Sequence, residues 1–196
     1  MESRIIVIDR KTKETQISLT LDLSGSGIVE SNTGIPYLDH MFTAMAFHGK
    51  FDLNIKATGD LDVDPHHLVE DLGLVLGQAL KESVEKYGGV KRYAHRIIPM
   101  DEALSEVTID VCMRPYLVYN ADYPQDRSGS FDMHLLREFF HGLSSKGAIT
   151  LHAICRYGEN SHHMSEALFK ALGIAIKEAY TPIESGTDSM STKGRL

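Results

Sequence analysis

The sequence predicts an α+β fold built from two copies of one unit. The motif His-His-x-x-Glu occurs twice, at 66–70 and at 162–166. A helical run of similar character follows each copy, DLGLVLGQALKESV after the first and ALFKALGIAIKEAY after the second. Alternating apolar and polar residues, typical of strands, precede both copies, so we infer an internal duplication. We expect two similar halves, each a small sheet with two helices on one face, whose helices form a common layer or flank one core.

Each half is expected to run strand, strand, helix, strand, helix, with room for one further strand. In the first half we expect a strand at 14–23, a turn at 24–27, a helix opening at 38–42 and a strand at 51–57. The corresponding segments of the second half are 106–113, 124–129, 136–140 and 148–156. Tyr87-Gly88-Gly89 is a helix-ending signal. We therefore divide the chain into a first repeat at 1–90, a second repeat at 91–185 and a tail at 186–196.

Composition limits the classes of function. The chain has 196 residues, of which 42% are hydrophobic, and it can bury a normal core. No apolar run approaches the roughly 20 residues that span a bilayer, and the N-terminus lacks the shape of a signal peptide. Cys112 and Cys155 lie in strand-like runs, so we expect buried free thiols and a reduced, cytoplasmic setting. A net charge of −7 argues against nucleic-acid binding, and an anionic substrate would need a local basic pocket.

The duplicated motif predicts metal binding. Paired histidines and a carboxylate at helical spacing are metal-ligand chemistry. Glu70 can lie on the same helix face as His66 or His67, but adjacent residues point about 100° apart. The adjacent imidazoles should therefore serve two different metals, and each metal needs further ligands from the other repeat or from another subunit. The alternative, a helix start with exposed histidines and a Glu favoured by the helix dipole, is disfavoured by the duplication.

Alignment of the halves adds a further ligand pair. His40 and Glu138 occupy equivalent places, each opening the first helix of its half. Eight donors result, which suits two metals with about four protein ligands each and positions left for substrate or water. They are His40, His66, His67, Glu70, Glu138, His162, His163 and Glu166. Imidazole and carboxylate without thiolate suit Mn, Fe, Zn, Ni or Co. The alternative for Glu138 is the solvated face of an amphipathic helix.

The other histidines carry weaker signals. His95, His134 and His141 have no partner at ligand spacing and are expected at the surface or in packing. His48 ends a helical run, where the dipole favours a cation. His152 lies in the strand-like run ITLHAI and could line either a site or the core.

The motifs resemble those of imidazoleglycerol-phosphate dehydratase, an enzyme of histidine biosynthesis. The resemblance covers nearly the whole chain and rests on dispersed motifs in the same order: RKTKET (10–15), GIPYLDHM (34–41), HG (48–49), DPHHLVEDLG (64–73), PMDEAL (99–104), RPY (114–116), GENSHHMSEALFKAL (158–172) and STKG (191–194). The chain departs from the family pattern in three places. Ala44 stands where Gln is frequent, Glu138 stands where His is frequent, and the tail reads DSMSTKG where Pro-Ser-Ser-Lys-Gly is usual.

The resemblance implies a fold, an assembly and a reaction. The fold would be a tandem duplication of a βαββα-like unit related to ribosomal protein S5 domain 2, with two four-stranded sheets and helices packed between or against them. The assembly would be a hollow homo-oligomer of 24 subunits, with two Mn²⁺ per active site at subunit interfaces. The reaction would be the elimination of water from D-erythro-imidazoleglycerol 3-phosphate to imidazoleacetol phosphate, with the metals as Lewis acids and templates.

The resemblance also implies roles for individual residues. The catalytic set is Glu14, His40, His66, Glu70, His162 and Glu166. Glu14 would shuttle protons between carbon and the departing hydroxyl, although a solvent-facing strand Glu is the alternative. All of these except Glu166 would also contact the substrate, together with His48, Arg92, Arg114, Lys170, Ser191, Thr192 and Lys193. Arg92 and Arg114 would hold the phosphate, the flexible tail would fold over the substrate with Lys193 on the phosphate, and Lys170 is a second candidate there.

Two other functions use the same residue types. A dinuclear metallohydrolase also needs His and carboxylate ligands, but the repeat shows no obvious bridging acid. A metal-dependent assembly protein would use the His pairs as structural ligands, and it would give no purpose to Glu14 or to the STKG tail.

Overall fold

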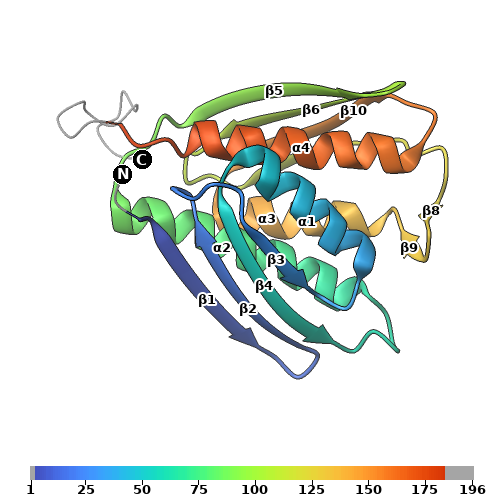
Figure 1. The fold of residues 1–196 in the computed structure, drawn as a ribbon, viewed down its shortest axis with the longest axis horizontal. Coiled ribbons are helices and arrows are strands. Elements are labelled where there is room, and N and C mark those ends of the chain that lie inside the picture. The colour runs from blue at the N-terminus through green and yellow to red at the C-terminus, as the bar shows by residue number, and fades with distance from the viewer. Residues whose placement is uncertain (1–2, 184–196) are drawn as a thin grey trace.

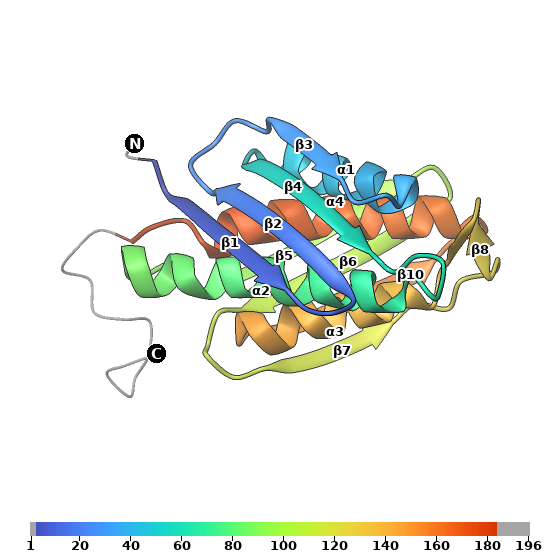
Figure 2. The same ribbon diagram turned by 90° about the horizontal axis from the view of Figure 1, so that it is seen from below.

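The computed structural model describes residues 3–183 and shows two four-stranded sheets with four helices between them (Figures 1 and 2). The first sheet has the order β1-β2-β4-β3 and the second repeats it as β5-β6-β10-β7. In each sheet the last strand runs parallel to its neighbour, and the other neighbours are antiparallel. The strands are β1 (Ile5–Lys11), β2 (Thr15–Asp22), β3 (Val29–Asn32), β4 (Asp52–Gly59), β5 (Tyr93–Met100), β6 (Ala103–Asp110), β7 (Tyr116–Asn120) and β10 (Thr150–Tyr157).

The helices complete the duplication. They are α1 (Pro36–Gly49), α2 (His66–Tyr87), α3 (Leu135–Gly147) and α4 (Ser161–Ala179). A small hairpin of β8 (Arg127–Ser128) and β9 (Phe131–Asp132) is inserted before α3 and has no counterpart in the first repeat. The predicted α+β class, the duplication and the two sheets are confirmed, and the optional further strand is present in each half as β3 and β7.

One predicted correspondence is wrong. The turn at 24–27 lies between β2 and β3, whereas 124–129 follows β7 and leads into β8. The true counterpart of the first turn is the segment 111–115 between β6 and β7. That segment contains no glycine and buries Val111 and Cys112, while Met113 supplies the positive φ of 56°. It therefore lacks the glycine and serine residues that mark the first turn, and only Pro115 in it is typical of turns. Strand β6 also begins and ends three residues before the predicted 106–113.

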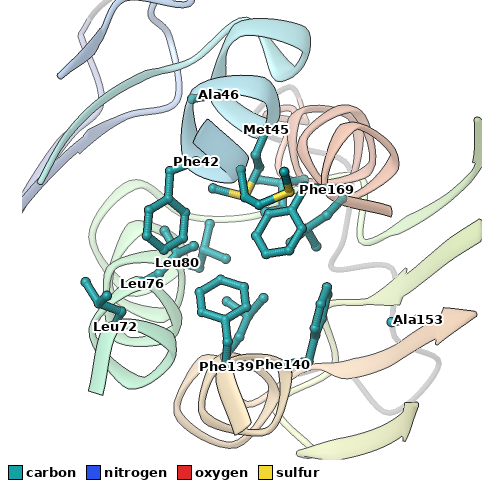
Figure 3. Close-up of a cluster of buried hydrophobic side chains, with 14 of the residues drawn as sticks. Phe42, Met45, Ala46, Leu72, Leu76, Leu80, Phe139, Phe140, Ala153 and Phe169 are labelled. Atoms are coloured by element: carbon teal, nitrogen blue, oxygen red, sulfur yellow. The ribbon is translucent and has the colours of Figure 1, made fainter. Parts of the chain in front are cut away.

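The helices pair across the repeats. α1 packs against α4 and α2 packs against α3, so the two repeats share one continuous core. Figure 3 shows Phe42, Phe139, Phe140 and Phe169 from three helices meeting in one cluster. Alternation in β2 and β6 turns one face of each sheet toward this cluster. The site residues are therefore placed by contacts between the two halves.

Glycines allow the paired helices to approach closely. A Cβ at Gly77 of α2 would lie 2.6 Å from the carbonyl oxygen of Leu143 in α3. Gly173 of α4 meets the carbonyl of Met45 in α1 in the equivalent way. The two contacts are counterparts in the repeat, so α4 lies on α1 as α2 lies on α3.

Two further expectations can be compared with the structure. Cys112 and Cys155 are buried and free, as predicted. Among the helices in residues 3–183, none has both the length and the apolar character needed to cross a bilayer.

Candidate metal centre

Three predicted ligands converge where the N-terminal turns of α1 and α4 meet. His40 Nε2 and His162 Nε2 each lie 3.1 Å from Oε2 of Glu166. Ligand atoms of these three residues all lie within 4.8 Å of one another. Two imidazole nitrogens and one carboxylate oxygen, with no thiolate, form a donor set that fits Mn²⁺ and other borderline divalent cations.

Local sequence fixes both helix starts. Pro36 occupies the first turn of α1, where its missing N–H costs nothing, and the carboxylate of Asp39 accepts the backbone N–H of Thr33 (3.0 Å). Asn160 caps α4, because its side-chain oxygen accepts the backbone N–H of His162 (2.9 Å). These starts place His162 in the first turn of α4 and His40 at the beginning of the second turn of α1, on two helices that run in the same direction.

Glu166 is ionised although it is buried. Burial opposes its ionisation, but hydrogen bonds from Lys170 and His40 outweigh it and lower the pKa of Glu166 to about 2. Lys170 Nζ lies 2.7 Å from Oε1, so the other oxygen, Oε2, faces the two histidines. The carboxylate is therefore available as a metal ligand at neutral pH, and Lys170, a predicted substrate contact, belongs to this cluster.

The inserted β8–β9 hairpin covers the cluster. Ser128 Oγ lies 3.4 Å from His162 Nδ1, and Phe131 stacks on Tyr37 with ring centroids 4.7 Å apart. The Tyr37 hydroxyl lies 2.5 Å from Ser165 Oγ, and its ring meets His162 edge-on. We did not predict Tyr37, Ser128 or Phe131 as site residues. For Ser128 and Phe131 the sequence offered one signal, because the connection before α3 is longer than the one before α1. We interpreted that connection only as a turn.

The equivalent residues of the other helix pair are less closely gathered. His66 Nε2 and Glu70 Oε2 lie 3.9 Å apart on α2. Glu138 occupies on α3 the place that His40 has on α1, but its carboxylate lies 3.7 Å from Arg137. The second half-site thus has one imidazole and two carboxylates, where the first has two imidazoles and one carboxylate.

The second histidine of each motif turns away from the first. The rings of His66 and His67 lie at 88° to each other, and those of His162 and His163 at 84°. His67 Nδ1 is 3.1 Å from Asp60 Oδ2 and 4.0 Å from Glu14 Oε2.

Carboxylates also surround His163. Its Nδ1 is 2.8 Å from Glu102 Oε2, and its Nε2 is 3.9 Å from Asp101. Hydrogen bonds that the histidines donate to carboxylates raise the pKa of both, chiefly the bond to Asp60 for His67 and the bond to Glu102 for His163. Asp60, Asp101 and Glu102 were not predicted as site residues.

The predicted phosphate arginines lie at the far end of the fold. The backbone N–H of Arg92 donates to the carbonyl of Ala179, the last residue of α4 (2.9 Å). Its guanidinium is buried against Asp110, at 2.6 and 3.2 Å. Arg114 is exposed, and its Nη2 lies 4.0 Å from Asp110. From Glu166 to Ala179 the helix rises by roughly 20 Å, so one chain does not bring these arginines to the cluster.

The remaining predicted residues fall in several places. His48 is at the C-terminal end of α1, where partial burial and the charge of Lys170 lower its pKa. Ser191, Thr192 and Lys193, with the predicted tail at 186–196, lie outside the described residues. His152 alternates with buried neighbours on β10 and faces away from the helices. His95, His134 and His141 are at the surface as expected, and Ala44 is buried in α1.

Comparisons with known proteins agree on one family. The family model described as imidazoleglycerol-phosphate dehydratase matches residues 33–176. The protein of that name from Rhodopseudomonas palustris (strain TIE-1) is 47% identical over 195 residues, covering 98% of each chain. The one from Geobacter sulfurreducens is 47% identical and covers 99% of this chain and 100% of its own.

Solved structures give the same result. The crystal structure of imidazoleglycerol-phosphate dehydratase from Staphylococcus aureus matches with a TM-score of 0.82 at 36% identity, covering 91% of this chain and 99% of its own. The Pyrococcus furiosus enzyme in complex with (S)-C348 matches with a TM-score of 0.84 at 39% identity, covering 96% and 100%.

Proposed function

The chain belongs to the imidazoleglycerol-phosphate dehydratase family and is a dehydratase of histidine biosynthesis, and we propose that it works with two Mn²⁺ ions held at sites that two or more copies of the chain complete. The convergence of His40, His162 and Glu166 is the observation that supports this proposal most directly. Three protein donors leave about half of a six-coordinate shell open for substrate, water or ligands from another copy.

We propose specific residues for each ion. His40, His162 and Glu166 would hold one, and His66, Glu70 and Glu138 would provide the equivalent half-site for the other. His67 and His163 point away from these groups, so they are placed to complete sites of neighbouring copies. When bound, the ions would supply Lewis-acid chemistry on the imidazole ring of the substrate and fix its orientation.

We propose that Glu14 carries the proton. It lies at the tip of the β1–β2 hairpin, where its backbone N–H donates to Thr12 Oγ (3.1 Å). Its side chain is 55% exposed, and Oε2 is 4.0 Å from His67 Nδ1. A carboxylate that is free to move beside a metal-binding histidine can take the proton from the carbon attached to the ring and deliver it to the departing hydroxyl.

The phosphate group would be bound by cations from more than one place. Lys170 belongs to the metal cluster, whereas Arg92 and Arg114 are about 20 Å away along α4. This separation supports an active site shared between copies, because a small substrate cannot span it within one chain. The family resemblance sets the expected assembly at 24 subunits. The buried free thiols suit a reducing compartment, and we propose the cytoplasm.

The test is a turnover assay with the full chain. Imidazoleacetol phosphate is followed from imidazoleglycerol phosphate before chelation, after chelation and after addition of Mn²⁺, while light scattering reports the assembly mass. We expect turnover to vanish on chelation and to return with Mn²⁺, and the mass to fall and recover with it. Undiminished turnover after complete removal of metal would reject metal dependence. Turnover from a monomer would reject shared sites.

A further inference from the structure

We propose that Glu102 and Asp60 are positioning residues that set the tautomer of the second histidine in each His-His-x-x-Glu motif. Each accepts the Nδ1–H of its histidine, His163 or His67, so that Nε2 keeps its lone pair and faces outward as a ligand atom. The inference rests on the proposed metal dependence and adds to it two acids that bind neither metal nor substrate themselves.

Glu102 is held from two sides. Its Oε2 lies 2.8 Å from His163 Nδ1. Its Oε1 accepts the backbone N–H groups of Glu159 (3.1 Å) and Asn160 (2.9 Å), which lead into α4. An ionised carboxylate can only accept hydrogen bonds, so Nδ1 of His163 must be the donor. In a neutral imidazole the lone pair is then on Nε2, which is how acids outside the coordination sphere commonly orient metal-binding histidines.

Asp60 does the same in the first repeat from a different element. It follows β4, and its two carboxylate oxygens lie 3.1 and 3.3 Å from His67 Nδ1. Its backbone N–H donates to the carbonyl of Glu14 (3.1 Å), which fixes it to the β1–β2 hairpin. In both halves a carboxylate therefore holds Nδ1 of the second histidine in the motif. The two acids, however, do not occupy equivalent positions in the repeat.

The true counterpart of Glu102 is Glu14. Each immediately precedes the second strand of its sheet, β6 or β2, at the tip of the first hairpin. Glu102 is fixed by three hydrogen bonds, whereas the carboxylate of Glu14 is more exposed and lies 4.0 Å from its histidine. Because Asp60 holds His67, Glu14 is released from that task and can move. The equivalent positions of the two repeats therefore differ in role, since Glu102 is held in place and Glu14 is free to move.

Substitution of Glu102 by glutamine distinguishes a role in setting the histidine tautomer from a purely structural role. If Glu102 only ties the hairpin to α4, Glu102→Gln should be tolerated, since its amide oxygen can still accept the two backbone N–H groups. Its NH₂ group then faces His163 and donates to Nδ1, which moves the histidine proton to Nε2 and blocks the ligand atom. Asp60→Asn acts on His67 in the same way. Both variants keep the side-chain shape and reverse only the hydrogen-bond polarity.

Glu106→Gln is the matched control. Glu106 lies on β6 and accepts a hydrogen bond from a histidine, His95 Nε2, at 2.9 Å. That pair is on the outer face of the second sheet, away from the helices and both motifs. The control therefore repeats the same chemical change on a His–carboxylate pair outside the proposed centre.

The experiment is a Mn²⁺ titration of the chelated full-length protein, with free Mn²⁺ measured by EPR, and melting of each metal-free protein. We expect Glu102→Gln and Asp60→Asn to weaken Mn²⁺ binding by about 10–100-fold. Their metal-free melting temperatures should match the wild type, and Glu106→Gln should bind as the wild type does. The Mn²⁺ signal at saturation should also change, because one nitrogen ligand is lost.

Three results would overturn the inference. Wild-type affinity in both variants would show that the acids do not set the ligand atom. If Mn²⁺ binding is weakened and the melting temperature of the metal-free variant falls as well, the two acids have a structural role only. A wild-type chain that turns over but binds no Mn²⁺ would overturn the proposed metal dependence together with this inference. If wild-type Mn²⁺ binding and turnover are normal while the variants are unaffected, only the inference fails.

Discussion

His40 and His162 lie with their rings nearly parallel, at 27° and with centroids 5.3 Å apart, and both direct Nε2 to the same oxygen of Glu166. The two histidines are far apart in the sequence. The pairing exists because α1 of the first repeat packs beside α4 of the second. The candidate centre is therefore a product of the contact between the two halves.

Glu166→Gln should remove metal from this cluster. The carboxylate oxygen shared by the two histidines becomes part of a neutral amide, which is a poorer ligand for a divalent cation. We expect a lower Mn²⁺ content and a fall in kcat of at least about 100-fold, on the scale of a lost charge-stabilising group. Elemental analysis beside kinetics checks both. Glu159→Gln, an exposed acid just before α4, is the control, and a fully metal-loaded, active Glu166→Gln would contradict the assignment.

Glu14→Gln should separate proton transfer from metal binding. The amide cannot take up a proton, while the hairpin and His67 keep their other contacts. We expect kcat to fall by about 100- to 10,000-fold with metal content and assembly mass unchanged. Glu30→Gln, another acid at the outer surface of the first sheet, should leave kcat as it is. An unchanged kcat in metal-replete Glu14→Gln would remove Glu14 from the reaction.

The two arginines should respond differently to removal. Arg114 is 69% exposed, so Arg114→Ala should raise KM about tenfold or more through loss of phosphate binding, with the melting temperature unchanged. Arg92 is buried against Asp110, and Arg92→Ala removes the cation closest to that carboxylate, with Arg114 at 4.0 Å. Here we expect a lower melting temperature as well. Steady-state kinetics with calorimetry distinguishes them, and an unaltered KM in Arg114→Ala would reject its phosphate role.

Gly77→Ala should destabilise the fold through the α2–α3 contact. The added methyl would lie 2.6 Å from the carbonyl oxygen of Leu143, so the helices must separate, at a cost of about 1–3 kcal/mol. Gly147→Ala is the control from the same contact, since its Cβ would meet Gly77 at an ordinary 3.5 Å. Urea denaturation of both metal-free variants measures the difference. Equal stability in the two would show that the close approach is not restrictive.

Asp52 should contribute a pH-dependent part of the stability. Burial alone would raise its pKa, but hydrogen bonds from the backbone N–H groups of Ile28, Ser26 and Gly27 outweigh it and lower the pKa below its ordinary value. A lowered folded-state pKa adds stability above the unfolded value, and that stability is lost as pH falls.

The variant that tests this is Asp52→Asn. It should be less stable than the wild type by on the order of 1 kcal/mol at neutral pH, and the difference should shrink below about pH 4. Urea unfolding of the metal-free proteins at several pH values measures it. A difference that does not change with pH would show that the charge of Asp52 plays no part.

Much of the fold could be predicted because the duplication is visible in local patterns. The His-His-x-x-Glu copies, the helical runs after them and the alternating strands each depend on neighbours in sequence. The equivalence of His40 and Glu138 also followed from the order of the elements. The end of α2 at Tyr87 is where Gly88 and Gly89 indicated it.

The remainder depends on contacts that sequence spacing does not encode. The turn between β6 and β7 has no glycine, because Met113 adopts the positive φ itself. Glu102 and Asp60 hold equivalent histidines from unlike positions, so aligning the repeats cannot reveal them. Ser128 and Phe131 reach the centre because the β8–β9 hairpin bends over it, and Phe131 stacks there on Tyr37 of α1.

The crossed pairing of the helices has a consequence for how such a chain could arise. Each half leaves part of the apolar surface of its two helices uncovered until the other half is present. A single unit would have had to associate with its own copy before the two were joined in one gene. The linker at Gly88 and Gly89 therefore connects two units that pack together as the subunits of a dimer would. Once the units were joined, equivalent positions no longer had to hold the same residue, and Glu14 could differ in role from Glu102 and His40 in identity from Glu138.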